Sequence, residues 1–428
     1  MDTIFALASA AGKAGVSIIR VSGPEALNIC ATMGAVLGDH DRRLVKLTSE
    51  DGSLIDQAFA ISFASRRSFT GEQVVELQTH GSPAIVSAVL KRLSGLDLRL
   101  AEPGEFTRRA MENGVLDLAQ VEGLADLIDS ETESQRRQAV RVFQGALGDL
   151  ASGWRASLVR AAALLEATID FVDEDVPVDV YPEVRALIES VTKEVRYEAA
   201  GVRVRERVRD GFEVALVGPP NSGKSTLLNR LAGREAAITS DIAGTTRDVI
   251  EVKMDLDGLP VTILDTAGLR DSDDVLEGIG IARGKDRASA ADVRVHLMEE
   301  LPTNPIQSDF GLDIYVKSKA DLEIQPVNNA VSGVTGYGMD RLLYQLSSYL
   351  RQQLAGAGVA TRTRHQRALE ASAVALDAVT LGLDVDDMPV DLLDEDLRIA
   401  IRSLDSLIGR VDVENVLGEI FSSFCIGK

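Results

Sequence analysis

A glycine-rich octapeptide near the middle of the chain limits the possible folds more than any other segment. It reads Gly218-Pro219-Pro220-Asn221-Ser222-Gly223-Lys224-Ser225 and fits the complete phosphate-binding loop pattern G-x-x-x-x-G-K-[ST]. An apolar run at 213–217 precedes it, and a helical pattern opens at 226–231 after it. Glycines at such positions let backbone N–H groups surround phosphate oxygens. The octapeptide therefore predicts an α/β nucleotide-binding domain, in which Lys224 reaches the β- and γ-phosphates and Ser225 ligates Mg²⁺.

Two further motifs follow the octapeptide in the order that nucleotide hydrolysis requires. Asp265-Thr266-Ala267-Gly268 follows an apolar run at 261–264. A carboxylate at that strand end can hold the Mg²⁺ shell, and the N–H of Gly268 can sense the γ-phosphate. Gly244-Thr245-Thr246-Arg247-Asp248 lies between them, where a switch segment is expected, and Thr246 is the candidate for a second hydroxyl on Mg²⁺.

The base-reading segment is Ser318-Lys319-Ala320-Asp321, after a strand-like run at 312–316. The carboxylate of Asp321 can accept both the N1–H and the 2-amino group of guanine, whereas adenine offers neither donor and would leave the acid unpaired. Lys319 can pack its stem along the base, and the backbone of Ser332-Gly333 is expected over the guanine oxygen. GTPases usually carry asparagine where this chain has Ser318, so one hydrogen bond is expected to be lost. The competing interpretation is an ordinary surface lysine and aspartate.

The residue that positions the attacking water is not fixed by chemistry alone. Many GTPases place a glutamine after the Asp-x-x-Gly motif, but this chain has Leu269, which cannot orient water. Acidic side chains that could do so follow at Asp271, Asp273, Asp274 and Glu277.

Composition restricts the partners and the compartment. The 428 residues carry 45 basic and 66 acidic side chains, so the formal net charge is 45 − 66 = −21. Such a surface repels phosphate backbones, so an RNA substrate would need a local basic patch or a partner protein. The only cysteines, Cys30 and Cys425, have no paired spacing, which favours a reducing compartment. We find no signal peptide and no run of 18 apolar residues, and we expect a cytoplasmic protein without membrane segments.

The residue composition and the hydrophobic pattern change three times along the chain. Residues 1–115 mix short apolar runs, such as Val16–Val21 and Val74–Leu77, with turn signals and indicate an α+β domain. Helix formers dominate from 116 to 210 and again from 348 to 428, around an α/β domain at 211–347. Apolar helical stripes are predicted at Leu187, Val191, Val195, Ala199 and Val202, and at Leu397, Ile401, Leu404 and Ile408. The α/β domain is thus inserted into a helical one, because the flanking helices need a shared partner to bury their faces.

The chain resembles, nearly end to end, the tRNA-modification GTPase family MnmE, also called TrmE. Besides the GTPase motifs, the resemblance is carried by Ser68-Phe69-Thr70-Gly71-Glu72, Pro103-Gly104-Glu105-Phe106-Thr107, Leu116-Asp117-Leu118-Ala119-Gln120 and Phe424-Cys425-Ile426-Gly427-Lys428. It implies an N-terminal folate-binding-like domain that dimerises and binds 5-formyltetrahydrofolate, a discontinuous helical domain and an inserted Ras-like G domain. It also implies a heterotetramer with the FAD-dependent protein MnmG. This complex adds an aminomethyl or carboxymethylaminomethyl group at carbon 5 of the wobble uridine in certain tRNAs, with the tRNA held largely by the partner.

The resemblance also assigns roles to residues. It implies a K⁺ ion that bridges the phosphates, surrounded by Asn221, Ser240, Ile242 and Thr245, and a pairing of two G domains across the dimer. The glutamate that positions water aligns with Glu277, which could otherwise be a solvated charge in an acidic stretch. The expected nucleotide contacts are Asn221, Ser222, Gly223, Lys224, Ser225, Thr226, Ser240, Asp241, Ile242, Ala243, Gly244, Thr245, Thr246, Asp265, Thr266, Ala267, Gly268, Ser318, Lys319, Asp321, Ser332 and Gly333.

The folate site implied by the resemblance uses Arg20, Glu76 and Lys428, although Arg20 could also be a surface arginine. Val115 stands where the family has a lysine, so the expected site lacks one cation. Cys425 either serves the modification step or packs as a small residue near a dimer interface.

Two other functions compete with that of a GTP-hydrolysing modification enzyme. Arg294 and His296 place polar groups in a normally apolar strand, and with Ser318 they indicate a divergent G domain. Such a domain could bind nucleotide weakly and leave the chain a scaffold or switch. A ribosome-assembly GTPase would share the middle domain but would leave both flanking regions unexplained.

Overall fold

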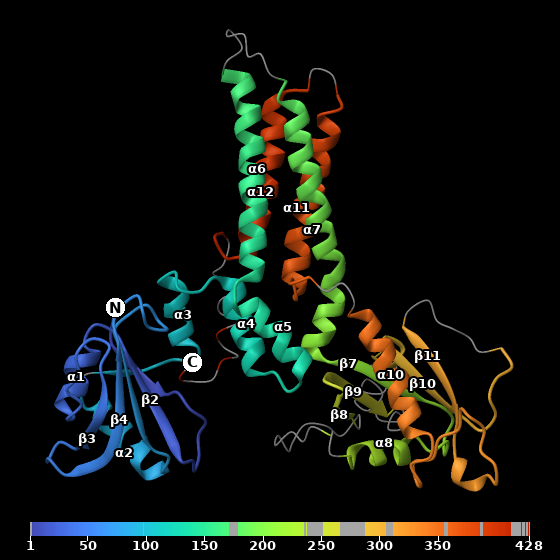
Figure 1. Cartoon of the computed structure of the whole chain (residues 1–428), viewed down its shortest axis with the longest axis horizontal. Helices are drawn as coiled ribbons and strands as arrows, with labels where there is room; N and C mark the ends of the chain where they lie inside the picture. Colours follow the sequence, from blue (N-terminus) through green and yellow to red (C-terminus); the bar gives the residue numbers. More distant parts are fainter. Residues whose placement is uncertain are drawn as a thin grey trace, which may run out of the picture. The chain divides into compact units, whose positions relative to one another are not determined.

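The computed structural model describes residues 2–96, 98–170, 179–234, 237, 251–265, 287–304, 311–354, 358–385, 388–411, 421, 424 and 427. The chain forms two compact units, each assembled from separate stretches of sequence (Figure 1). The first contains Met1–Ala125, Phe143–Ala156 and Ile401–Lys428, and the second contains Asp126–Val142 and Ser157–Ala400. Within the described residues each unit holds one β-sheet, and the fold combines α+β and α/β parts as the sequence predicted.

The first unit is built on a six-stranded sheet in the order β3-β4-β5-β2-β1-β6. Neighbouring strands run antiparallel, except that β1 and β6 are parallel. Its strands are β1 (Ile4–Leu7), β2 (Val16–Ser22), β3 (Arg42–Thr48), β4 (Leu54–Phe63), β5 (Val74–His80) and β6 (Arg99–Leu100). Its helices include α1 (Ala26–Thr32), α2 (Pro83–Ser94), α3 (Glu105–Glu112) and most of α4 (Leu118–Ile128).

The two faces of this sheet have different environments. Alternate residues such as Ile19, Val21 and Leu77 pack against α1 and α2 in an apolar core. On the opposite face, Ile4 and Ala6 pack with Phe106 of α3. Because side chains alternate along a strand, Arg20 lies on the face of Ile4 rather than in the larger core.

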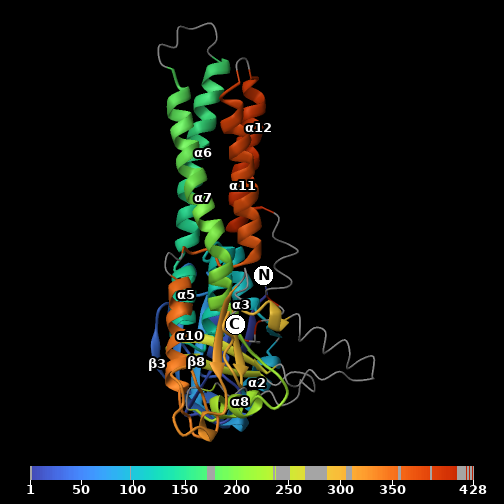
Figure 2. The same ribbon diagram turned by 90° about the vertical axis from the view of Figure 1, so that its right-hand side faces the viewer.

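The long helices lie mostly in the second unit, although α6 begins and α12 ends in the first. Figures 1 and 2 show α6, α7, α11 and α12 side by side, with α5 near the base of α7. Their bounds are α5 (Glu133–Phe143), α6 (Ala146–Asp170), α7 (Tyr181–Asp210), α11 (Thr363–Gly382) and α12 (Val390–Leu407). Among the described helices, none is long and apolar enough to cross a membrane.

The predicted helical stripes are largely correct. On α7, Val191, Val195 and Val202 are buried, while Leu187 is only half-buried because its neighbour Ile188 takes the core position. On α12, Leu397 and Leu404 are fully buried, with Ile408 buried just beyond its end, but Ile401 is half-buried.

The α/β part of the second unit is a five-stranded sheet in the order β11-β10-β7-β9-β8. Of its described strands, only β8 runs antiparallel to its neighbour. Its elements are β7 (Phe212–Val217), α8 (Lys224–Ala232), β8 (Glu251–Leu256), β9 (Leu259–Asp265), β10 (Val293–Met298), β11 (Leu312–Lys317), the 3₁₀ turn Ala320–Leu322 and α10 (Met339–Gln353). The β8–β9 connection is the predicted hairpin: Asp257 (φ 54°) and Gly258 (φ 86°) both have positive φ, as a type I′ turn requires.

Candidate nucleotide-binding site

The octapeptide begins directly after β7, as predicted, and its last two residues, Lys224 and Ser225, form the start of α8. Gly218 has φ 158°, and a Cβ there would lie 2.4 Å from the carbonyl oxygen of Leu297. No other residue fits so close to a neighbouring backbone without moving it. The loop therefore needs this glycine to pass the end of β10 before it turns into the helix.

Lys224, the first residue of α8, is buried, and its ammonium is held by the loop itself. Its Nζ donates to the carbonyl oxygens of Gly218 at 2.7 Å and Pro219 at 2.9 Å. Burial lowers the pKa of Lys224, and the nearby carboxylate of Asp265 opposes that shift. A cation held beside the loop amides suits phosphate oxygens, because the negative charge of a triphosphate would stabilise the charged form of Lys224 that burial disfavours.

Ser225 and Asp265 meet at the carboxyl end of the sheet. Asp265 ends β9 opposite Leu216 of β7, so the strand register brings it beside the loop. The hydroxyl of Ser225 donates to Oδ2 of Asp265 at 2.7 Å. A hydroxyl and a carboxylate are the hard oxygen donors that Mg²⁺ prefers. The hydroxyl of Ser222 is also buried in this loop and has no hydrogen-bond partner among the described residues, so these residues fit Mg²⁺ and a phosphate group.

The base-reading residues lie in two loops that bind each other. Oδ1 of Asp321 accepts a hydrogen bond from the hydroxyl of Ser332, which in turn accepts from the backbone N–H groups of Val334 and Thr335. Asp321 is exposed at the surface, so its carboxylate is held in place while one oxygen stays accessible. Each carboxylate oxygen has two lone pairs, so Oδ1 as well as Oδ2 can accept from one of the two parallel donors of guanine.

Ser318 and Lys319 connect the base-reading loop to β10. The hydroxyl of Ser318 donates to the carbonyl oxygen of Met298 at 3.3 Å, and its backbone N–H donates to the same oxygen at 2.8 Å. Lys319 has a left-handed backbone (φ 59°), and its ammonium pairs with Glu299 at 2.9 Å.

The phosphate loop and the base-reading loops are packed together through Gly333. A Cβ on Gly333 would lie 2.8 Å from the backbone N of Leu227 in the first turn of α8. The predicted phosphate-binding and base-reading residues are thus brought to the same end of the sheet. Thr226 is exposed on that turn, and Asn221 has φ 61° in the loop.

The polar residues in β10 have partners on the edge strand. Arg294 donates to both carboxylate oxygens of Asp313, at 2.8 and 3.1 Å, and His296 contacts the same carboxylate at 2.7 Å. The ring of His296 also stacks on Tyr315, with centroids 4.5 Å apart. The polar side chains of β10 therefore find their hydrogen-bonding partners within the sheet.

The expected folate residues Arg20 and Glu76 are adjacent in the first unit. They face each other across β2 and β5, and Nε of Arg20 donates to Glu76 at 3.0 Å. The guanidinium also lies 5.3 Å from the ring centroid of Phe69 and 5.5 Å from that of Phe106. Both aromatics belong to motifs seen in the sequence, but nothing there signalled their role as walls around Arg20. Val115 is 40% exposed and lies near Gly71 of the same loop as Phe69.

Several predicted residues lie outside the described part of the chain. They are Ser240, Asp241, Ile242, Ala243, Gly244, Thr245, Thr246, Thr266, Ala267, Gly268, Glu277, Cys425 and Lys428. Within the first unit, Gly427 packs so closely on β1 that a Cβ there would lie 2.0 Å from the carbonyl oxygen of Leu7.

A mostly parallel sheet with the phosphate loop, a hydroxyl–carboxylate pair and the fixed carboxylate of Asp321 at one end places this chain among the P-loop GTPases. Comparison with known proteins narrows this class. The family model for the MnmE helical domain matches residues 118–425, and the model for the GTP-binding protein TrmE N-terminus matches residues 3–115. The chain belongs to the MnmE family of tRNA modification GTPases.

Individual relatives match over the whole chain. It is 56% identical to the tRNA modification GTPase MnmE of Ruegeria pomeroyi over 430 residues, and 58% identical to that of Cereibacter sphaeroides over 433 residues, with 100% of both chains covered in each case. Among solved structures, the G domain of the T. maritima FeoB iron transporter is 26% identical, with a TM-score of 0.24, and the match covers 32% of this chain and 98% of that one.

Proposed function

We propose that this chain binds and hydrolyses GTP and uses that hydrolysis in the modification of tRNA. The observation that carries the proposal is the packing of the Gly333 segment on the first turn of α8. It supports one site in which a base and a triphosphate are bound together rather than two unrelated polar clusters. Family membership supports the role in tRNA modification.

Different described residues bind the base, the phosphates and Mg²⁺. Asp321, oriented by Ser332, accepts the two guanine donors and disfavours adenine. Lys224 leaves its loop carbonyls and turns to the β- and γ-phosphates, where its charge opposes the negative charge that develops during transfer. Ser225 and Asp265 hold Mg²⁺, which neutralises the phosphate oxygens when bound.

The finer features follow from the family resemblance. Glu277 positions the attacking water, Thr246 completes the Mg²⁺ site, and Asn221, Ser240, Ile242 and Thr245 hold K⁺ where the G domains of a homodimer pair. The domain boundaries near residues 115, 210 and 347 belong to the same proposal. With the FAD-dependent MnmG, the chain adds a (carboxymethyl)aminomethyl group at carbon 5 of the wobble uridine, in the cytoplasm.

The N-terminal domain binds 5-formyltetrahydrofolate through Arg20, Glu76 and Lys428 in this proposal. The two aromatic rings beside Arg20 support it, because they add flat apolar surfaces suited to a pteridine. Val115 supplies no charge to this site.

Nucleotide binding and phosphate release test the first half of the proposal. We expect the full chain to bind a fluorescent GTP analogue at least a hundredfold more tightly than the ATP analogue, and to release phosphate faster in KCl than in NaCl. Glu277→Ala should bind GTP normally but hydrolyse it at least tenfold more slowly. Equal binding of GTP and ATP, or a rate that neither the cation nor Glu277→Ala changes, would refute it.

Analysis of wobble uridine tests the second half. In a deletion strain, tRNA should lack the carbon 5 group, and the wild-type gene should restore it. Lys224→Ala should fail to restore it at equal protein level. A deletion strain with fully modified wobble uridine would show that the GTPase serves another process, such as ribosome assembly.

A further inference from the structure

Arg287 follows one predicted switch segment and contacts the strand that follows the other. It is the first described residue after the stretch that contains Glu277, and its Nη1 donates to Glu251 at 3.1 Å. Glu251 in turn is the first residue of β8, directly after the stretch that contains Thr246. One guanidinium therefore ties together the chain downstream of both segments.

The same guanidinium reaches the central strand. Its Nε donates to the carboxylate of Glu213 on β7 at 2.7 Å. Burial alone would lower the pKa of Arg287, but its bonds to the two glutamates outweigh this and raise it. Arg287 is therefore a charged three-way junction between β7, β8 and the helical turn at 287–289.

Glu213 connects Arg287 to the end of helix α7. Its backbone N–H donates to Oδ2 of Asp292 at 2.9 Å, and Oδ1 of Asp292 lies 3.1 Å from Nε of Arg207 in the last turn of α7. Burial raises the pKa of Asp292, and the guanidinium of Arg207 opposes that shift. Breaking this pair would leave a half-buried acid with one fewer partner.

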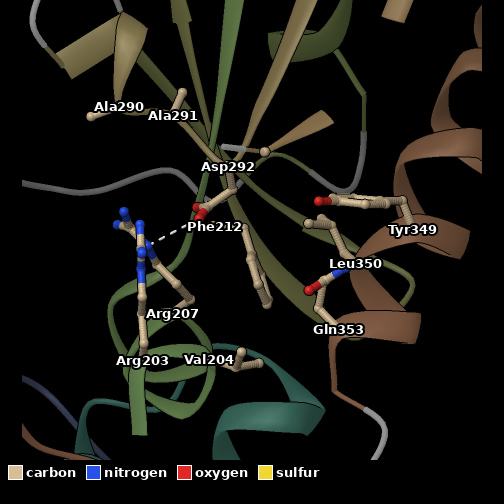
Figure 3. Close-up of a pocket in the computed structure, with 11 residues that line it drawn as sticks. Arg203, Val204, Arg207, Phe212, Ala290, Ala291, Asp292, Tyr349, Leu350 and Gln353 are labelled. Atoms are coloured by element: carbon tan, nitrogen blue, oxygen red, sulfur yellow. Dashed lines mark ion pairs between the residues drawn. The ribbon is translucent and has the colours of Figure 1, made fainter. Parts of the chain in front are cut away.

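The pair between Asp292 and Arg207 borders a cavity of about 250 Å³. Figure 3 shows Arg207 and Asp292 on one side, with Tyr349, Leu350 and Gln353 of α10 across from them. Val208 in the same last turn of α7 packs into the apolar core of the α/β domain, whereas the contact between Arg207 and Asp292 borders the cavity and is not closely packed. Such a contact can break with little rearrangement of the core.

We propose that these residues form an ionic chain that transmits the nucleotide state of the G domain to helix α7. Its members, in order, are Glu251, Arg287, Glu213, Asp292 and Arg207. The link from Glu213 to Asp292 is a hydrogen bond from the backbone N–H of Glu213, and the other links are ion pairs. The inference rests on the proposed GTPase function. Loss of the γ-phosphate rearranges switch segments, and displacement of either segment shifts the position of Arg287. This shift is transmitted through the start of β7 to the last turn of α7. Coupling of this kind needs a contiguous network with two arrangements.

Hydrogen exchange in the full chain tests the proposal. We compare GDP with a non-hydrolysable GTP analogue and follow the amides of residues 203–211, at the end of α7. Wild type should show a nucleotide-dependent difference. In Arg287→Ala and Asp292→Asn this difference should fall at least fivefold, while the affinity for fluorescent GDP changes less than twofold.

Two further variants control for misfolding and for general charge loss. Glu251→Gln keeps the shape of the side chain and should reproduce the effect of Arg287→Ala even if the latter folds poorly. Arg234→Ala removes an ion pair of 2.8 Å with Asp340 elsewhere in the same domain and should keep the wild-type difference.

The outcomes separate this inference from the proposed function. A wild-type chain that prefers GTP to ATP but shows no difference at residues 203–211, or variants that keep the full difference, would overturn the ionic chain alone. Loss of the difference together with loss of nucleotide binding in all three variants would also overturn it, because the residues would then act on the site itself. Loss of GTP preference in wild type would instead refute the GTPase assignment.

Discussion

Replacing Glu198 by alanine should destabilise the second unit by about 4 kcal/mol. Glu198 and Arg205 lie on α7 and are 5% and 1% exposed. Oε2 of Glu198 accepts the N–H groups of Val359 at 2.8 Å and Ala360 at 3.2 Å, and it lies 3.3 Å from the guanidinium of Arg205. This one carboxylate therefore anchors the segment that leads from the G domain to α11.

The magnitude follows from what the alanine would leave behind. Removal of one partner from a buried ion pair costs about 3–5 kcal/mol, because the remaining charge is uncompensated. Burial lowers the pKa of Arg205, and Glu198 opposes that shift, so loss of the carboxylate makes the guanidinium harder to keep charged. Two buried N–H groups would also lose their acceptor, at about 1–3 kcal/mol each. These penalties overlap where water enters, so we take the middle of the first range.

A comparison of variants separates charge compensation from simple packing. Glu198→Gln combined with Arg205→Met removes both charges at similar volume and should cost less than about 2 kcal/mol. Unfolding of the full chain in urea, followed by circular dichroism at 222 nm, gives both values. A loss below about 1 kcal/mol for Glu198→Ala would refute the reasoning, as would a double variant that is no more stable than the single one.

Three other predictions concern the nucleotide site and acid stability. Asp321→Asn should shift the preference from GTP to xanthosine triphosphate at least tenfold in competition binding, because an amide can donate to the xanthine 2-oxygen. Ser225→Ala should lower the Mg²⁺-dependent rate of GTP hydrolysis by at least about tenfold with little effect on folding. Burial raises the carboxyl pKa of Glu105, but hydrogen bonds from Arg99, the backbone N–H of Glu102 and Arg109 outweigh it, so the pKa lies below 4.5. Hydrogen bonding to Arg99 lowers the pKa of Asp2 to about 2. The two carboxylates contribute their full stabilisation above their pKa values in the unfolded chain, and this stabilisation is lost as the pH falls through their lowered pKa values in the folded chain. The urea concentration at the unfolding midpoint should therefore fall between pH 4.5 and pH 2, and it should fall less in Glu105→Gln.

The elements that could be predicted from the sequence are those set by local chemistry. The β8–β9 hairpin is specified by Asp257-Gly258, which tolerates positive φ at both turn positions. The phosphate loop is equally local, because its glycines and flanking strand and helix are contiguous. Helix periodicity located the buried face of α7, although it could not choose between Leu187 and Ile188 on adjacent positions.

The parts that could not be predicted depend on register and on long-range packing. Arg294 was visible in the sequence as a polar residue in an apolar strand, but its partner Asp313 is fixed only by the parallel pairing of β10 with β11. Arg287 carries no motif at all, and its role emerges only when the fold brings Glu213 of β7 and Glu251 of β8 within reach of one guanidinium. Polar residues without a local reason are where sequence analysis is weakest, because their partners lie far along the chain.

The substitution of serine for asparagine at position 318 shows how large a departure from the family pattern the site can accept. Both the hydroxyl and the backbone N–H of Ser318 donate to the carbonyl oxygen of Met298, so the loop stays anchored to β10 without an amide side chain. The loss is then limited to about one hydrogen bond to the nucleotide, which is about 1 kcal/mol or roughly fivefold in affinity. Ser318→Asn should therefore tighten binding of fluorescent GDP about fivefold and leave that of ATP unchanged. Because Asp321 keeps its orientation from Ser332 in either case, a variant that gained affinity for both nucleotides alike would mean that position 318 acts on the phosphates rather than on the base.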